Sequence, residues 1–351
     1  MVDSSCQVSD EARALHADAL VIDLHADTLI PMRAGGYDIS RRHRFRLPRS
    51  ALFFHCDLPR WREGGINGQF FGLVTVPYPQ RGCAAATHRQ IDLLERVCRE
   101  NPDAIRLART VADLDAARAD GVLAAFMGIE GAHNLEGDIA NLQVFFDRGV
   151  RSVGLAHFTS NNMAPAAFGA GSGNDAPLPG PGCEFVERAN EMGMIVDLAH
   201  LGRRAFMDVA RRSRRPLLVS HTGLRAVCDV WRNIKDDQLR AVADTDGVVG
   251  IIFARPFISR DRVKDSRRVV AHLDHIRRTI GARHAALGSD FDGAITPVDG
   301  LCDVSHVPVL TQHMLDLSWP EEDIRATLGE NVRRIIGAHE PVDVEPEKGD
   351  R

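Results

Sequence analysis

Eight short apolar segments recur along this chain of 351 residues, and helical segments separate most of them. The apolar segments cover residues 19–27, 68–77, 121–131, 150–159, 193–202, 216–223, 247–256 and 284–293. Helices are expected between them at residues 86–100, 138–149, 183–193, 203–213, 236–246 and 266–281. Short, nearly continuous apolar strands that alternate with helices are typical of a parallel sheet covered by helices.

Eight strand–helix units in roughly 300 residues predict an α/β fold of the (β/α)8 TIM-barrel type. The alternative is a doubly wound open sheet, which would favour a glycine-rich phosphate loop after the first strand. The sequence there, HADTLIP, is not such a loop. We therefore expect one domain over residues 1–351, with the barrel and its loops at about 18–340 and short extensions at both ends.

Two long segments are expected to leave the same end of the barrel. Residues 33–65 follow the first strand, and residues 163–182, rich in Gly, Pro and Ala, connect the fourth and fifth strands. Long loops in compact domains are often functional. Because the loops that follow barrel strands form the active site, both segments are expected beside it.

The composition narrows the class of protein. The net charge is -5 and no basic stripe is present, which argues against a nucleic-acid partner. No segment approaches the ~18 uninterrupted apolar residues of a membrane span, and the first residues lack a signal-peptide pattern. We therefore expect no membrane partner and a cytoplasmic location. The seven cysteines include no CxxC pair and are interpreted as reduced thiols.

Ionisable side chains stand at the ends of six of the eight expected strands. They are His25 and Asp27 on the first strand, then Glu130, His157, His200, His221 and Asp290 on the third, fourth, fifth, sixth and eighth. The second and seventh strands end without one. Barrel enzymes take their catalytic residues from these carboxyl ends, so the seven side chains are expected to converge on one rim.

Each of these residues has an ordinary structural explanation when it is taken alone. A strand-end histidine is commonly held by hydrogen bonds, and an aspartate such as Asp290 commonly caps a helix or forms a turn. Independent structural roles would rarely fill six of eight strand ends. Imidazole and carboxylate together are ligands that suit Zn²⁺. Seven candidates are too many for one tetrahedral ion, so we expect two ions that share a bridging carboxylate.

Glu130 is the expected bridge. Some metallohydrolase barrels use a carbamylated lysine instead, but Lys235, Lys264 and Lys348 are the three lysines here and none stands at a strand end. The remaining histidines are interpreted as structural. His272 and His275 lie in the helix before the eighth strand, and the surface or helix positions are His16, His43, His88, His284, His306, His313 and His339. His55 and His133 stay open as site residues.

The ordered motifs resemble the membrane dipeptidase (renal dipeptidase) family of zinc peptidases, which have amidohydrolase-like barrels. The matching stretches are DLHADT, DLPRWREGGINGQFF, GIEG, LAHFTSNNMA, NEMGMIVDLAH, VSHTGLRAVCDVWRNIKDDQLRAVA, HLDHIRRTIGARHAALGSDFDG and LGENVRRII. They follow the family order from about residue 20 to residue 337. One such motif alone would be weak evidence for this family, but the full set in this order is highly specific to it.

The resemblance implies a ligand set. His25 and Asp27 would hold one zinc ion. His200 and His221 would hold the other. Glu130 and a water or hydroxide would bridge the two ions.

The resemblance also implies three roles in catalysis. His157 would polarise the substrate carbonyl and stabilise the oxyanion, Asp290 would act as acid and base on the bridging water, and Arg232 would pair with the substrate's terminal carboxylate. The chemistry agrees with these roles. A carboxylate can accept and return a proton, an imidazole can stabilise developing charge, and a guanidinium fork fits a carboxylate in a bidentate pair.

Three positions depart from the usual pattern of the family. Ala26 stands where asparagine is usual, and Ala199 stands where serine is usual. Neither position supplies a ligand, so metal binding is expected to survive. Phe257 stands where animal members have a tyrosine near the substrate. That change concerns substrate preference.

The expected function is hydrolysis of dipeptides with a free C-terminal carboxylate by a dinuclear zinc enzyme. The resemblance further implies tolerance of a D-residue at the C-terminal position and a homodimer. One alternative is a metal-dependent hydrolase of N-acyl amino acids, lactams or lactones that uses the same site. Another is a metal-binding or interaction protein without turnover. A dipeptidase should reject N-acetylated substrates, whereas a protein without turnover would bind zinc and hydrolyse no short peptide. The ligand set would also accept Mn²⁺ or Co²⁺.

Overall fold

A computed structural model describes residues 7–43, 52–75, 81–173 and 175–340. Its strands are β1 (Ile22–Ala26), β2 (Gly68–Leu73), β3 (Ile105–Leu107), β4 (Leu123–Ile129), β5 (Val150–Gly154), β6 (Ile195–Asp197), β7 (Leu218–Thr222), β8 (Val248–Ile251) and β9 (Ala285–Leu287). The α-helices are α1 (Asp10–Asp18), α2 (Leu29–Gly35), α3 (Leu58–Glu63), α4 (Cys83–Glu100), α5 (Val111–Ala119), α6 (Ala140–Asp147), α7 (Gly180–Met192), α8 (Arg203–Arg212), α9 (Asp236–Ala243), α10 (Arg255–Ile258), α11 (Ser266–Ile280), α12 (Pro308–Asp316), α13 (Glu321–Arg325) and α14 (Asn331–Ala338). Short helical turns are η1 (Ala132–Leu135), η2 (Ala282–His284), η3 (Val304–His306) and the π-helical η4 (Ala326–Glu330).

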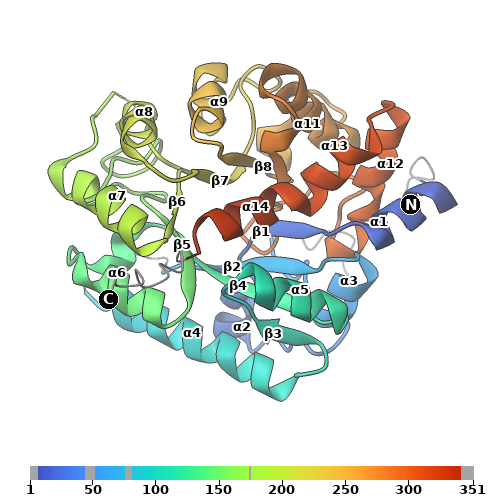
Figure 1. Cartoon of the computed structure of the whole chain (residues 1–351), viewed down its shortest axis with the longest axis horizontal. Helices are drawn as coiled ribbons and strands as arrows, with labels where there is room; N and C mark the ends of the chain where they lie inside the picture. Colours follow the sequence, from blue (N-terminus) through green and yellow to red (C-terminus); the bar gives the residue numbers. More distant parts are fainter. Residues whose placement is uncertain (1–6, 44–51, 76–80, 174, 341–351) are drawn as a thin grey trace, which may run out of the picture.

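The strands form a closed parallel ring (Figure 1). Neighbouring strands follow the order β2-β1-β9-β8-β7-β6-β5-β4, and pairing of β2 with β4 closes the ring. The first and last strands of the chain are therefore neighbours, with Asp23 opposite Leu287. Parallel strands need long crossover connections, and the helices in those connections surround the strands. The fold is the predicted (β/α)8 barrel.

All eight expected strands and all six expected helices are present, and the structure adds one strand to the sheet. β3 lies outside the ring and pairs with β4 through Ile105 and Leu123. This strand was not predicted, because its three residues, Ile-Arg-Leu, are too few for a pattern. Residues 76 and 77 of the second expected strand lie outside the described residues, as does Lys348.

The expected helices did not include the one that connects β3 and β4. In this helix, α5, Thr110 and Asp113 form a reciprocal capping box, in which each side chain accepts a hydrogen bond from the other residue's backbone N–H. Such a cap satisfies amides that the first helical turn leaves unpaired. A nine-residue helix can therefore begin sharply at the end of a short strand.

The barrel interior is filled by apolar side chains. One buried cluster contains Ile22 of β1 together with Ile195 of β6, and these two strands lie on opposite sides of the ring. The aromatic rings of Phe70 and Phe126 stack inside the same cluster with centroids 4.9 Å apart. A larger buried cluster joins the outer faces of the strands to the surrounding helices.

Two helices cover the amino-terminal end of the barrel. Leu114 of α5 lies near Gly68 at the start of β2, and α14 follows η4, whose Gly329 packs against the carbonyl of Leu20. In Figure 1 both helices lie across the strands. Because this end is closed, the carboxyl ends of the strands and their loops are left to form a site.

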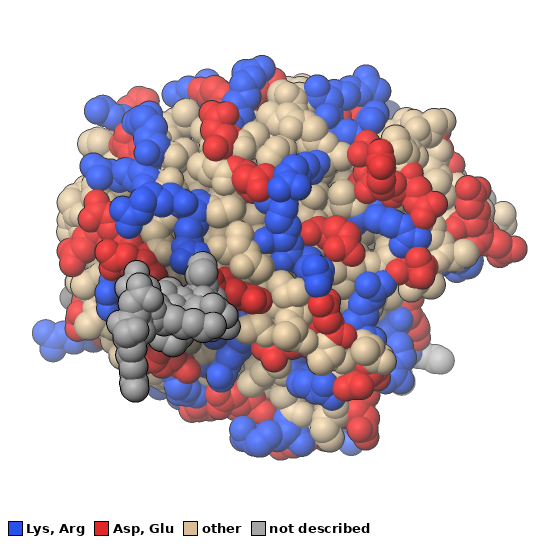
Figure 2. Space-filling model, in the orientation of Figure 1, with Lys and Arg blue, Asp and Glu red and all other residues tan. Residues whose placement is uncertain are grey.

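The visible surface carries charges of both signs. Figure 2 shows acidic and basic side chains interspersed over the face that contains α5 and α14. Among the described residues, no helix is both long enough and apolar enough to cross a membrane.

Truncating Phe126 tests the filled interior. Its side chain is 0% exposed, so Phe126→Ala should leave a cavity and destabilise the protein by about 3–5 kcal/mol. Urea denaturation followed by circular dichroism measures the shift in midpoint. The control is Val144→Ala on α6, where the side chain is 44% exposed and the expected change is within about 0.5 kcal/mol. Equal shifts for the two variants would contradict a packed interior.

Candidate metal centre

The seven strand-end residues predicted from the sequence lie at the carboxyl end of the barrel. His25 and His221 belong to β1 and β7 themselves, and Asp27 and Glu130 follow β1 and β4 closely. His157, His200 and Asp290 each lie three residues after their strands, β5, β6 and β9. All seven are buried. Chain segments from residue 25 to residue 290 therefore meet in one place.

Glu130 lies at the centre of this cluster. Its Oε1 atom is 3.0 Å from His200 Nε2, 3.4 Å from His221 Nε2 and 3.6 Å from His157 Nε2. Its Oε2 atom is 3.7 Å from His25 Nε2. The two oxygens of one carboxylate therefore face different histidines.

The second part of the cluster surrounds His25. Its Nε2 atom is 3.4 Å from Asp27 Oδ1 and 3.8 Å from Asp290 Oδ1. The His25 ring also stacks on the ring of His221, with centroids 4.1 Å apart. His25 thus connects the two aspartates to the remaining histidines.

The donor atoms fit a metal. Three groups of side chains have ligand atoms within 4.8 Å of one another. They are His25–Glu130–His221, Glu130–His157–His200 and His25–Asp27–Asp290. Among the described residues, His25 Nε2, Asp27 Oδ1 and Glu130 Oε2 are buried without a hydrogen-bond partner. Buried polar atoms are normally paired, so atoms left without partners at one point indicate a ligand.

Burial and neighbouring charges together shift the pKa values of the clustered histidines. Burial lowers the pKa of His200 well below its usual value, and the positive charge of Arg232 lowers it further. Burial likewise lowers the pKa of His221, with His25 adding to the effect. Neutral imidazole is the form that binds a metal. Burial alone would also lower the pKa of His25, but the carboxylates of Glu130 and Asp27 outweigh it and raise that pKa well above the usual value.

The carboxyl groups respond to the same surroundings. Burial works to raise the pKa of Glu130, yet the imidazoles of His157 and His25 hold it well below its ordinary value. Burial raises the pKa of Asp290 well above its ordinary value, although His25 opposes the rise. Carboxyl groups whose surroundings push their pKa values apart are typical of sites that transfer protons.

Two site residues occupy a backbone conformation that favours glycine. The φ angles are 64° at His200 and 62° at Asp290. Left-handed backbone at a non-glycine residue persists only where the surroundings impose it. The 163–182 segment does so for His200, because the N–H of Ala167 donates to the His200 carbonyl over 2.8 Å. This long loop therefore helps to hold one site residue in place.

Arg232 lies beside the cluster, in the loop after β7. It is buried, and its Nη2 atom donates to the carbonyl of His221 over 2.7 Å. Its charge acts on the pKa of His157, His200 and His221. The predicted arginine therefore shares the site with the predicted ligands.

Exposed aromatic rings lie next to these polar residues. Phe158, adjacent to His157, has its ring 5.3 Å from that of His200. Phe168 of the long loop stacks on Trp231, and Trp231 contacts the half-buried Phe257. Phe158, Phe168 and Trp231 are 42%, 50% and 42% exposed.

Gly72 on β2 is a supporting residue that was not predicted, on a strand that supplies no candidate ligand. A Cβ atom on Gly72 would lie 2.0 Å from Asp27 Oδ1 and 3.1 Å from His25 Cε1. The lack of a side chain at Gly72 therefore leaves room for the Asp27 carboxylate and the His25 ring. A glycine within an apolar strand was the available signal, because it marks a close approach.

A second omission is the buried pair Asp197 and Ser220. The hydroxyl of Ser220 donates to Asp197 Oδ2 and lies 2.9 Å from His221 Nδ1. The signal was an aspartate inside an otherwise apolar strand, since buried carboxylates need partners.

The remaining histidines lie outside the three donor groups found among the described residues. His55 Nδ1 accepts a hydrogen bond from the backbone N–H of Asp292, and His133 Nε2 lies 2.7 Å from Thr159 Oγ1. Four of the histidines interpreted as structural are buried and hydrogen-bonded, and three of them lie on helices. The four are His16, His284, His313 and His339.

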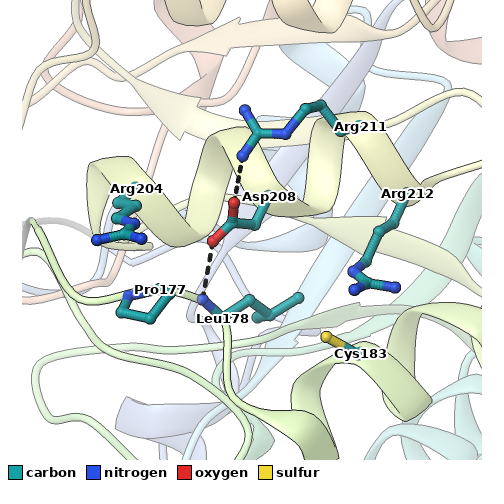
Figure 3. Close-up of a pocket in the computed structure, with 7 residues that line it drawn as sticks. All are labelled: Pro177, Leu178, Cys183, Arg204, Asp208, Arg211 and Arg212. Atoms are coloured by element: carbon teal, nitrogen blue, oxygen red, sulfur yellow. Dashed lines mark hydrogen bonds and ion pairs between the residues drawn. The ribbon is translucent and has the colours of Figure 1, made fainter.

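A pocket of about 330 Å³ lies apart from the metal centre, beside α7 and α8 (Figure 3). Asp208 bonds both the backbone N–H of Leu178 and the guanidinium of Arg211 there. Arg212 is paired with Glu187. None of the predicted site residues lines this pocket.

A parallel (β/α)8 barrel with a histidine–carboxylate cluster at its strand ends is an arrangement that suits a metal-dependent hydrolase. Residues 9–348 match the sequence model of the family described as "Membrane dipeptidase (Peptidase family M19)". The chain belongs to this family, as the motifs predicted, and is a zinc-dependent metallo-dipeptidase.

Individual relatives agree with the family. A protein of Klebsiella pneumoniae, described as an uncharacterized protein in the pqqA 5' region, is 32% identical over 255 residues, which cover 71% of this chain and 94% of that protein. A metallopeptidase of Rhodobacter sphaeroides, solved with a phosphinate mimic of L-Ala-D-Ala, is 26% identical with a TM-score of 0.79, over 92% of this chain and 100% of that one. A solved dipeptidase AC of family M19 is 29% identical with a TM-score of 0.79, over 92% and 98%.

Adding one methyl group at Gly72 tests the space kept beside Asp27. Gly72→Ala should push the Asp27 carboxylate aside and weaken zinc binding by about 10–100-fold, the usual effect of disturbing a residue that supports a ligand. Competition with a chromophoric chelator measures the affinity. The control is Gly68→Ala on the same strand, whose Cβ would meet only the apolar side chains of Ile22 and Leu114, at 3.2 and 3.3 Å. Wild-type affinity in a folded Gly72→Ala variant would contradict this role.

Proposed function

We propose that this metallo-dipeptidase works with two zinc ions held between the carboxyl ends of its strands. The position of Glu130 supports the proposal most directly, because its two oxygens face different histidines. A single tetrahedral ion needs at most four ligands, and the cluster offers seven candidates. Two ions that share Glu130 use these donors more completely.

The proposed ligands follow the family pattern. His25 and Asp27 would hold one ion, His200 and His221 would hold the other, and Glu130 would serve both. The stacked rings of His25 and His221 keep the two sets adjacent. When bound, the zinc ions supply Lewis acidity that lowers the pKa of water towards neutrality.

The chain's own residues provide the proton transfers and charge stabilisation. Asp290 accepts a proton from the attacking water and returns it to the leaving amine. Its buried position supports that role, because burial makes the protonated form accessible. His157, whose Nε2 lies 3.6 Å from Glu130, stabilises the negative charge that develops on the carbonyl oxygen.

Arg232 provides the proposed contact for the substrate's C-terminal carboxylate. Its guanidinium is buried beside the histidines, and a buried guanidinium binds a carboxylate strongly through paired hydrogen bonds. Such a contact restricts substrates to peptides that end one residue past the scissile bond. Recognition of the carboxylate leaves the configuration of that last residue less constrained, so a D-residue is accepted. The Rhodobacter metallopeptidase solved with an L-Ala-D-Ala mimic is consistent with that tolerance. The family resemblance also predicts a homodimer, which sedimentation equilibrium can test.

Hydrolysis of three matched peptides tests the substrate class. The zinc-loaded enzyme should cleave L-Ala-D-Ala and L-Ala-L-Ala, and it should cleave N-acetyl-L-Ala-D-Ala little or not at all. Amine release measured by chromatography gives the rates, and metal analysis of the same sample should give two zinc ions per chain. Preferred cleavage of the acetylated peptide would instead favour a hydrolase of N-acyl amino acids. No cleavage, with two zinc ions bound, would reject the dipeptide class.

Replacing Arg232 tests carboxylate recognition separately from catalysis. Arg232→Met should lower kcat/KM for L-Ala-D-Ala by at least ~30-fold, because loss of a buried charged contact costs about 2 kcal/mol or more. The same variant should lose the preference for the free acid over the C-terminal amide. Arg225→Met is the control, because Arg225 lies in the same loop but pairs with Asp229 at the surface. A retained preference for the acid would show that another group binds the carboxylate.

A further inference from the structure

A buried hydrogen-bond chain supports His221 from the side opposite Glu130. The Oδ1 atom of Asp197 accepts the backbone N–H groups of Ala199 and Ser220 over 3.0 and 2.9 Å. Its Oδ2 atom accepts the hydroxyl of Ser220 over 2.5 Å. The same hydroxyl oxygen lies 2.9 Å from Nδ1 of His221. None of these atoms had a role in the mechanism above.

Counting hydrogens along this chain determines the direction of each bond. A serine hydroxyl has one hydrogen, and an ionised carboxylate has none. The hydroxyl of Ser220 therefore donates to Asp197, and its oxygen is left as an acceptor towards the imidazole. The hydrogen between Ser220 and His221 must then be on Nδ1.

We propose that Asp197 and Ser220 are positioning residues that fix His221 as the tautomer with hydrogen on Nδ1 and a bare Nε2. Nε2 lies 2.9 Å from His200 Nε2 and 3.4 Å from Glu130 Oε1, inside the proposed ligand set. The other tautomer would place a hydrogen on the ligating atom. The presence of this tautomer does not depend on the proposed function. Only its use, to offer Nε2 to a zinc ion, rests on that function.

A second carboxylate in the barrel provides a matched comparison. Asp23 accepts the backbone N–H of Ser289 on Oδ1 and the Ser289 hydroxyl on Oδ2, over 2.7 and 2.6 Å. Ser289 precedes Asp290 as Ser220 precedes His221. The difference is the next contact, because the Ser289 hydroxyl lies 3.0 Å from the carbonyl of His25 and not from an imidazole nitrogen. Asp23 should therefore have no effect on the tautomer of His221.

Asp197→Asn is designed to reverse the direction of the hydrogen bonds from residue 197 to His221 without changing the size or shape of the side chain. The two backbone N–H groups require an oxygen, so the amide of the new residue must point its NH2 group at Ser220. The serine oxygen then accepts, and its hydrogen turns to Nδ1 of His221. The hydrogen of the imidazole is displaced to Nε2.

The experiment is ¹⁵N NMR of the histidine rings in the full-length, metal-free protein, with His221 assigned from a His221→Asn variant. The expected spectrum has His221 protonated on Nδ1 in the wild type and in Asp23→Asn, and on Nε2 in Asp197→Asn. Chelator competition should show zinc binding about 10–100-fold weaker for Asp197→Asn than for the wild type.

Two further variants keep the test decisive if Asp197→Asn folds poorly. Ser220→Ala removes the acceptor, so the Nδ1 preference should disappear and zinc affinity should fall. Ser220→Thr keeps the hydroxyl, so the Nδ1 preference of His221 and the zinc affinity should both stay close to those of the wild type. A wild-type spectrum with hydrogen on Nε2, or an unchanged tautomer in Asp197→Asn and Ser220→Ala, would overturn the inference. A wild type that binds no zinc but has hydrogen on Nδ1 would refute the proposed function and leave the chain intact.

Discussion

Burial of the Glu130 carboxylate is the constraint on which the site depends. An isolated charge in the interior of a barrel is strongly unfavourable, and it persists only when opposite charge or metal ions compensate it. Three imidazoles approach one oxygen of Glu130 and a fourth approaches the other. These contacts require β1, β5, β6 and β7 to bring their carboxyl ends to one point, which a closed parallel ring achieves.

The support for this centre is layered. The histidines and carboxylates that face the centre are held by groups that never face it, such as Ser220 behind His221 and Ala167 behind His200. Gly72 contributes by having no side chain. Precision in such a site comes from residues whose own positions are fixed by packing and by hydrogen bonds. The long 163–182 loop therefore belongs to the structure of the site as well as to its surface.

The sequence was sufficient for the barrel and for the residues that meet at its rim. The regular alternation of apolar strands and helices predicted the ring, and polar residues at strand ends predicted the cluster. The three-residue β3 left no periodicity to detect. The division of Glu130 between two sets of histidines depends on side-chain directions, which a linear pattern does not contain. The Asp197–Ser220 pair had a signal, an aspartate in an apolar strand, but its partner lies on the neighbouring strand and emerges only when strands are paired.

The pairing of the first strand, β1, with the last strand, β9, has a consequence for synthesis of the protein. The site draws on residues from His25 to Asp290, and the seam between β1 and β9 cannot form until β9 has left the ribosome. A growing chain therefore lacks one wall of the barrel and the Asp290 carboxyl group that follows it during most of translation. The seven buried side chains can therefore meet at one point only after the last strand of the chain has been made.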